Sequence, residues 1–373
     1  MIASLPLKKI IFQMKIGIID WYIIKKYLGT FVFTMAIFSI IIVVFDISER
    51  LDDFIRHEAP LSKIIFQYYA GFLPFYLNFL SPLINFIAVI FFTAKMADQT
   101  EIVPILSSGV SFNRFLYPYF ISSFIIFVIT LAFNLFIIPE TNQLFVEFEN
   151  VYLNPKADNT KLYTHLQLNK NSYVYIENFD NNQKIGFKFS LEKFKGDELV
   201  EKTVSDRILW DSVKHKWQLE NYSIRKINGL KESMTSGIKK DTSLDMRPVD
   251  FEIYDNLTKA MNMKELDTRI EKEKIRGAGI MDELLLEKYR RFIYPFSAFV
   301  LTLMGVALSS RKVRGGIGLP LGLGILLSFV YILFIQFANM FSLKGGLPPL
   351  IATLIPNILF GIISLYLLVK APK

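Results

Sequence analysis

Residues 27–47 read YLGTFVFTMAIFSIIIVVFDI, an apolar run in which Asp46 is the single charged side chain. An α-helix over this run is about 30 Å long, which matches the hydrocarbon core of a lipid bilayer. The run is too long for the core of a signal peptide, and no small-residue cleavage site follows it. We therefore expect a retained membrane-spanning helix at this position.

Five further apolar runs are long enough to cross a bilayer, because a spanning helix needs roughly 17 to 25 residues. They cover residues 64–94, 115–138, 292–308, 317–341 and 347–369. Pro74 and Pro82 interrupt the first of these runs, which is long enough to span even when kinked. The composition agrees, since 52% of the residues are hydrophobic and only 20% are charged. The sequence predicts six transmembrane helices.

The lysine and arginine residues lie beside the apolar runs, and membrane topology explains the formal net charge of +8 better than nucleic-acid binding does. The segments on one side of a six-helix topology hold Lys8, Lys9, Lys15, Lys25, Lys26, Lys95, Arg114, Arg311, Lys312, Arg314, Lys370 and Lys373. On the other side, residues 48–60 hold more acids than bases, and residues 342–349 hold Lys344 as their one base. The positive-inside rule then places both termini in the cytoplasm.

A large polar segment, residues 140–287, separates the third apolar run from the fourth. Residues 172–179, 184–194 and 215–227 alternate between apolar and polar side chains, which is typical of half-buried β-strands. Several such strands without long helices indicate a small antiparallel sandwich or jelly roll. The charged stretch MKELDTRIEKEKIRGAG, residues 263–279, is predicted to be a helical connector that returns the chain to the membrane.

The predicted fold is therefore an α-helical membrane protein with six transmembrane helices, arranged as three plus three, and an inserted antiparallel β-jelly-roll-like domain. We expect an N-terminal membrane half at residues 1–139, the β-domain with its helical connector at 140–287, and a C-terminal membrane half at 288–373.

The sequence contains no recognisable catalytic or metal motif. It lacks a phosphate-cradling G-x-x-x-x-G-K-[ST] loop and a G-x-S-x-G nucleophile elbow, and it has no cysteine. Its three histidines have no ligand spacing. The glycine-rich run at 314–324 enters an apolar run, which favours close helix packing over nucleotide binding. We expect no catalytic residue, no metal site and no bound cofactor in this chain.

Residues 93–110, TAKMADQTEIVPILSSGV, form a polar segment between the second and third apolar runs, on the predicted cytoplasmic side. A helix is expected over residues 94–109, with its apolar side chains in one broken stripe. Two interpretations are open. The helix either lies on the lipid surface or docks as a coupling helix into the groove of a partner protein.

Four stretches resemble the lipopolysaccharide export permease family, LptF/LptG. These are DWYIIKKYLGTF (20–31), AKMADQTEIVPILSSGVS (94–111), EKYRRFIYPFSAFVLTLMGVALSSRKVRGG (287–316) and GGLPPLIATLIPNILFGIISLYLL (345–368). The second is similar to the family's segment between spans two and three, and the third to its span-four block. Their order, their spacing and the intervening β-domain make the resemblance specific.

The resemblance implies a permease subunit of an ABC exporter in the bacterial inner membrane, with its middle domain in the periplasm. The implied partners are a cytoplasmic ATPase dimer that uses ATP and Mg²⁺, a sister permease in a heterodimer, periplasmic jelly-roll bridge proteins and lipopolysaccharide. Two alternatives stay open: a related ABC permease that moves lipoproteins or another amphiphile, and a membrane sensor that transports nothing.

The resemblance also indicates candidate residues. Those expected to couple the chain to the ATPase are Ala97, Asp98, Glu101, Ile102 and Ile105. Those expected to meet lipid are Asp46, Glu49, Arg50, Arg56, Arg290 and Arg291. The outer end of the first helix is acidic where family members often carry bases, so a phosphate there requires either a bridging cation or the arginines.

Overall fold

The computed structural model describes residues 16–153, 160–181, 183–229, 231–251, 257–276, 280–310 and 316–370. The basic residues expected at positions 8, 9, 15, 311, 312, 314 and 373 lie outside these ranges. The chain divides into two compact units. The helical unit comprises Met1–Leu51, Phe72–Ile137 and Tyr289–Lys373, and the β unit comprises Asp52–Gly71 and Ile138–Lys288.

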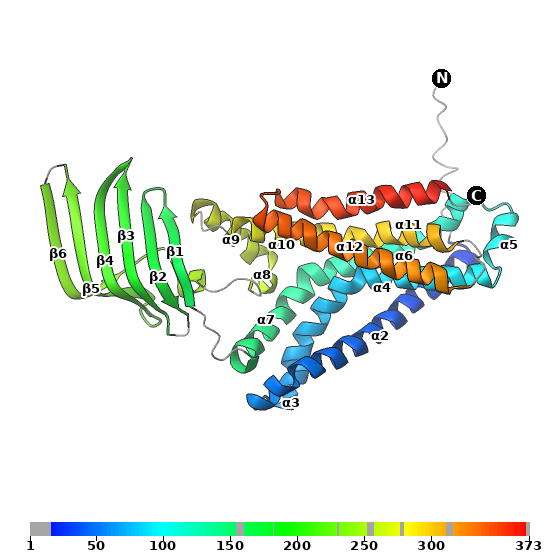
Figure 1. Cartoon of the computed structure of the whole chain (residues 1–373), viewed down its shortest axis with the longest axis horizontal. Helices are drawn as coiled ribbons and strands as arrows, with labels where there is room; N and C mark the ends of the chain where they lie inside the picture. The colour runs from blue at the N-terminus through cyan, green and yellow to red at the C-terminus, as the bar shows by residue number, and fades with distance from the viewer. Residues whose placement is uncertain are drawn as a thin grey trace, which may run out of the picture. The chain divides into compact units, whose positions relative to one another are not determined.

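Within the described residues, six helices are long and apolar enough to cross a membrane, which confirms the predicted number. They are Ile18–Arg56 (α2), Leu61–Asp98 (α3 Leu61–Lys63, η1 Ile64–Tyr69, α4 Ala70–Asp98), Phe112–Leu153 (α6 Phe112–Ala132, η2 Phe133–Ile137, α7 Ile138–Phe148, η3 Glu149–Leu153), Met281–Ser309 (α10 Met281–Ile293, η5 Tyr294–Phe296, α11 Ser297–Ser309), Gly318–Lys344 (α12) and Pro349–Lys370 (α13). In the helical unit, α11 lies against α6 and α13, and α12 lies against α13 (Figure 1).

Two glycines allow the helices of this unit to approach closely. A Cβ atom at Gly305 of α11 would lie 2.8 Å from a methyl group of Val89, and one at Gly324 of α12 would lie 2.2 Å from a methyl group of Ile90. Both partners belong to α4. Small residues are the usual means by which membrane helices pack tightly. Gly324 thus has the packing role expected of the glycine-rich run, whereas a Cβ atom at Gly316, Gly318 or Gly322 would meet nothing within 4 Å.

A buried polar cluster joins three of the spanning helices. The hydroxyl of Tyr27 in α2 donates to Asn85 Oδ1 of α4 at 2.6 Å and lies 2.7 Å from Thr302 Oγ1 of α11. The Asn85 amide donates in turn to the backbone oxygen of Ala298 at 3.2 Å. Polar groups inside a membrane bundle cost free energy unless they are paired, so these hydrogen bonds fix the register of α2 against α4 and α11.

The β unit holds an antiparallel six-stranded sheet inserted between the third and fourth spanning helices, as the sequence predicts (Figure 1). Its strands are β1 Thr160–Asn169, β2 Ser172–Asp180, β3 Ile185–Lys195, β4 Glu198–Asp211, β5 Lys216–Asn228 and β6 Lys231–Thr242. Each strand pairs with the next one in sequence, so the sheet is a meander. Residues 172–179, 184–194 and 215–227 correspond to β2, β3 and β5, and β1, β4 and β6 are further strands outside these three stretches.

One face of the sheet carries the core of the β unit. Phe179, Phe189, Ile208 and Trp217 are fully buried there, and Trp217 Nε1 donates to the backbone oxygen of Met246 at 2.9 Å. This bond fixes the chain that follows β6, which includes the 3-10 turn η4 Pro248–Phe251, against the sheet.

Two short helices follow, α8 Leu257–Ala260 and α9 Met263–Arg276. The predicted helical connector is thus present up to Arg276, and residues 277–279 lie outside the described ranges. A capping box opens α9, because the backbone N–H of Asn262 donates to Glu265 Oε2 at 2.9 Å and the N–H of Glu265 donates to Asn262 Oδ1 at 3.0 Å.

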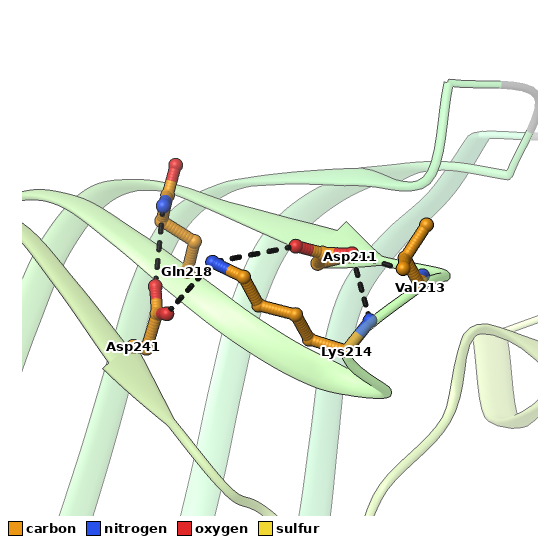
Figure 2. A network of polar contacts seen from close by, with 5 residues as sticks. All are labelled: Asp211, Val213, Lys214, Gln218 and Asp241. Atoms are coloured by element: carbon orange, nitrogen blue, oxygen red, sulfur yellow. Dashed lines mark hydrogen bonds and ion pairs between the residues drawn. The ribbon is translucent and has the colours of Figure 1, made fainter.

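Polar contacts fix the β4–β5 turn to β6 (Figure 2). Backbone N–H groups of Lys214 and Val213 donate to Asp211 Oδ1 at 3.0 and 2.9 Å and lower the pKa of its carboxyl group. Hydrogen bonds from Gln218 and Lys214 lower the pKa of Asp241 likewise. Both carboxylates are therefore ionised at neutral pH, where Lys214 lies between them.

Candidate coupling site at the ends of helices α2, α4 and α6

The residues between α4 and α6 do not form the single helix that was expected over 94–109. Instead α4 ends at Asp98, and a short helix, α5 Ile102–Ser107, follows. Thr100 adopts a left-handed backbone with φ of 57°. The Thr100 N–H donates to Ala97 O at 3.1 Å, and the Glu101 N–H donates to Met96 O at 2.9 Å. This hydrogen-bond pair is a Schellman motif, which ends a helix and redirects the chain.

Local hydrogen bonds also fix the backbone in the second half of the segment, where α5 ends and α6 begins. Pro104 stands in the first turn of α5, where its missing N–H costs nothing. Gly109, with φ of 88°, follows the end of α5, and its N–H donates to Leu106 O at 3.2 Å. Ser111 then caps α6 by accepting a hydrogen bond from the Arg114 N–H. The 94–111 segment therefore has a defined backbone throughout.

Glu101 lies at the bend between α4 and α5 and contacts the start of α2. Its Oε2 accepts a hydrogen bond from the Tyr22 hydroxyl at 2.9 Å, and its Oε1 lies 3.8 Å from Lys26 Nζ. Lys26 also donates to the Tyr22 hydroxyl and lies over the Tyr22 ring. The Glu101 side chain is about one-third exposed, so the carboxylate is held within the chain yet remains reachable from outside.

A second ion pair joins the first turn of α2 to the first turn of α6. Arg114 donates from both terminal nitrogens to the carboxylate of Asp20, at 2.6 and 2.5 Å. The Gly17 N–H donates to the same carboxylate at 2.7 Å. Asp20 is only 5% exposed. This bidentate geometry is the strong form of an arginine–carboxylate contact, and it fixes the two helix starts to one another.

The predicted coupling residues divide into two groups by exposure. Ala97 and Ile102 are buried with Met96 and Phe112 in the core of the helical unit, and they hold the segment on the bundle. Asp98 is exposed, and Glu101 and Ile105 are half-buried. Val103, which is not among the predicted coupling residues, is 62% exposed on α5.

A shallow hollow lies beside α5. It is lined by Leu106, Ser107, Val110, Ser111, Phe112 and Asn113. Its walls come from the end of α5 and the start of α6, so the exposed side of the 94–111 segment is not a flat helix surface.

The predicted lipid-contact residues are spread over both units. Asp46, in the C-terminal half of α2, is buried, and its Oδ1 lies 3.5 Å from Arg50 Nε, one turn further along. Glu49 is exposed on the same helix. Arg290 is half-buried and Arg291 is 3% exposed near the end of α10, where the backbone oxygen of Arg291 accepts from Asn134 at 3.4 Å. Arg56 is exposed and belongs to the β unit.

The six apolar helices and the inserted β-sheet define a multi-pass membrane protein, and no cluster of metal-ligating side chains occurs among the residues that the structure describes. The sequence matches the family model described as lipopolysaccharide export system permease LptF/LptG over residues 21–370, and the chain belongs to this family. It is therefore an inner-membrane permease of the lipopolysaccharide export system, a transport subunit that is not itself catalytic. No individual curated protein matches the sequence.

Proposed function

We propose that this chain is the half-transporter of an ABC exporter that extracts lipopolysaccharide from the inner membrane and passes it to a periplasmic bridge toward the outer membrane. A sister permease completes the membrane domain, and a cytoplasmic ATPase dimer supplies the energy by hydrolysing ATP with Mg²⁺. The family match over residues 21–370 is the observation that carries this proposal.

The 94–111 segment is the proposed contact with the ATPase. Asp98 and Val103 are exposed on it, and Glu101 is partly so, while Ala97 and Ile102 anchor it to the bundle. One side of this segment is packed on the helical unit and the other side is exposed. A movement of a partner bound to the exposed side would therefore be transmitted to α2, α4 and α6. In this account Glu101 pairs with a basic residue of the ATPase groove.

The proposed cargo contacts are arginines in the C-terminal parts of α2 and α10, namely Arg50, Arg56, Arg290 and Arg291. A guanidinium fork matches phosphate oxygens and needs no third component, whereas the neighbouring Glu49 would require a bridging cation. Arg50 also neutralises Asp46, which reduces the acidity of this end of α2.

The experiment that tests this function is purification of the chain from its native membrane, followed by identification of the proteins and lipids that accompany it. We expect an ATPase, a second permease and bound lipopolysaccharide. A complex that holds the ATPase but carries lipoprotein or another amphiphile would reject the cargo assignment. A chain isolated without any ATPase would favour a membrane sensor.

The proposed orientation places both termini in the cytoplasm and the β unit in the periplasm, and the excess of bases in one set of short loops supports it. The chain has no native cysteine, so any labelling by a thiol reagent comes from the single cysteine that is introduced. A cysteine at Ser107 of α5 should react with an impermeant maleimide only after the inner membrane is opened, and one at Ser236 of β6 should react in intact spheroplasts. Both positions are exposed. Labelling of Ser107 from the periplasm would overturn both the orientation and the coupling role.

A further inference from the structure

A pocket of about 610 Å³ lies within the β unit, between α9 and the chain that follows β6. Its volume falls in the range of roughly 300–1,000 Å³ that small-molecule sites usually have. The floor is apolar. Met246 and Ala260 are buried there, and Met261 is half-buried. Because Trp217 donates to the backbone oxygen of Met246, this floor is fixed to the core of the sheet.

The rim of the pocket carries cationic side chains from two elements. Lys264, Thr268 and Lys272 are exposed and lie four residues apart along α9, so they share one face of that helix. Arg247, also exposed, comes from the chain after β6. These groups can converge on one anion, the lysines as point charges and Arg247 as a planar fork.

Two of the three carboxylates that line the pocket have structural roles. Asp250 accepts hydrogen bonds from the buried Arg269 and, at 2.8 Å, from the Arg247 N–H. Glu265 caps the start of α9. The third carboxylate, Asp245, lies on the rim beside the exposed bases. Asp250 and Glu265 therefore stabilise the backbone and the helix that surround the pocket, and the exposed rim remains predominantly basic.

The helix that forms this rim packs next to the start of a spanning helix. Leu266 and Ile270 of α9 form one apolar cluster with Leu284 of α10. Residues 281–309, which begin with α10, form a candidate membrane span. An apolar floor under a basic rim suits an anionic headgroup with a hydrocarbon part, which is the chemistry of a membrane amphiphile.

We propose that this pocket binds a phosphorylated amphiphile, with the phosphate on Lys264, Lys272 and Arg247 and the hydrocarbon on Met246 and Met261. The site is separate from the coupling segment and from the residues expected at the outer end of α2. The inference adds a separate binding site for a phosphate-bearing amphiphile to the proposed export function, and its test on this chain alone does not require an assembled exporter.

The test uses the full chain held in a non-ionic amphipol, with hexyl phosphate as the probe, and saturation-transfer NMR as the readout. We expect saturable binding of hexyl phosphate that weakens at least tenfold in the Lys264→Gln/Lys272→Gln variant, and also in Arg247→Gln. The matched control is Lys274→Gln, an exposed lysine of α9 outside the pocket, which should leave the affinity unchanged.

Two further probes separate the parts of the proposal. Inorganic phosphate should bind at least tenfold more weakly than hexyl phosphate, and hexanol should not compete. Inorganic phosphate that binds as tightly would assign the pocket to a free anion and overturn the amphiphile assignment. Hexyl phosphate affinity that survives all the pocket substitutions would overturn the site itself.

Discussion

The Glu101→Lys variant should insert normally into the membrane but bind the proposed partner ATPase about 30-fold or more weakly, with a matching loss of ATPase stimulation. Truncating one partner of a desolvated interfacial charge pair costs about 2–5 kcal/mol, and charge reversal adds repulsion to that cost. Within the chain, the new lysine would also face Lys26, which now lies 3.8 Å from the Glu101 carboxylate. The measurement is ATPase activity of the purified complex, alongside the amount of ATPase that co-purifies.

Tyr22→Phe is the matched control for this experiment. It removes the hydrogen bond that Glu101 accepts within the chain and leaves the carboxylate in place. If Glu101 contacts the ATPase directly, Tyr22→Phe should retain most of the coupling. An equal loss in both variants would mean that Glu101 acts by positioning the 94–111 segment on α2. Normal assembly and stimulation in Glu101→Lys would reduce the segment to an interfacial helix.

The Arg114→Met variant should lower the stability of the chain by about 3 kcal/mol. Removing one partner of a buried ion pair leaves an uncompensated charge and costs about 3–5 kcal/mol, and we expect the lower end because Arg114 is about one-third exposed. Asp20, only 5% exposed, would then keep the Gly17 N–H but lose both guanidinium hydrogen bonds. Thermal unfolding followed by intrinsic fluorescence measures this loss.

A double variant shows whether the loss arises from the pair. Asp20→Asn/Arg114→Met removes the buried charge together with its partner, so it should be more stable than Arg114→Met alone. Lys25→Met removes an exposed base from the same end of α2 and should change stability little. A double variant no more stable than Arg114→Met would contradict the pairing account.

The membrane helices could be predicted from the sequence because the signal is one of length and apolar content. The run at 27–47 needs no partner to be recognised, and the structure places it inside α2. The β-sheet was harder to predict. Strand β2 alternates clearly between buried and exposed positions, whereas almost every residue of β6 is exposed, so no alternation marks it as a strand. Pairing with β5 makes β6 a strand, and pairing is a long-range property.

The candidate site could be predicted only in part, for two physical reasons. Glu101 was recognised from its local segment, but its contacts with Tyr22 and Lys26 join residues far apart in sequence, as does the Asp20–Arg114 pair. The helix break at Thr100 could not be predicted, because the left-handed residue that ends a helix is usually a glycine or an asparagine, and here it is a threonine. No residue pattern within 94–111 predicts the long-range contacts of Glu101 or the helix break at Thr100.

We propose that this chain moves lipopolysaccharide with energy from a partner ATPase. The most direct measurement is release of lipopolysaccharide from proteoliposomes that contain the assembled complex, with a soluble periplasmic acceptor outside. We expect release that requires ATP and Mg²⁺, fails with a non-hydrolysable ATP analogue, and fails in the Glu101→Lys variant. Release that proceeds without ATP hydrolysis, or ATP-driven release of another amphiphile while lipopolysaccharide stays in the membrane, would contradict it.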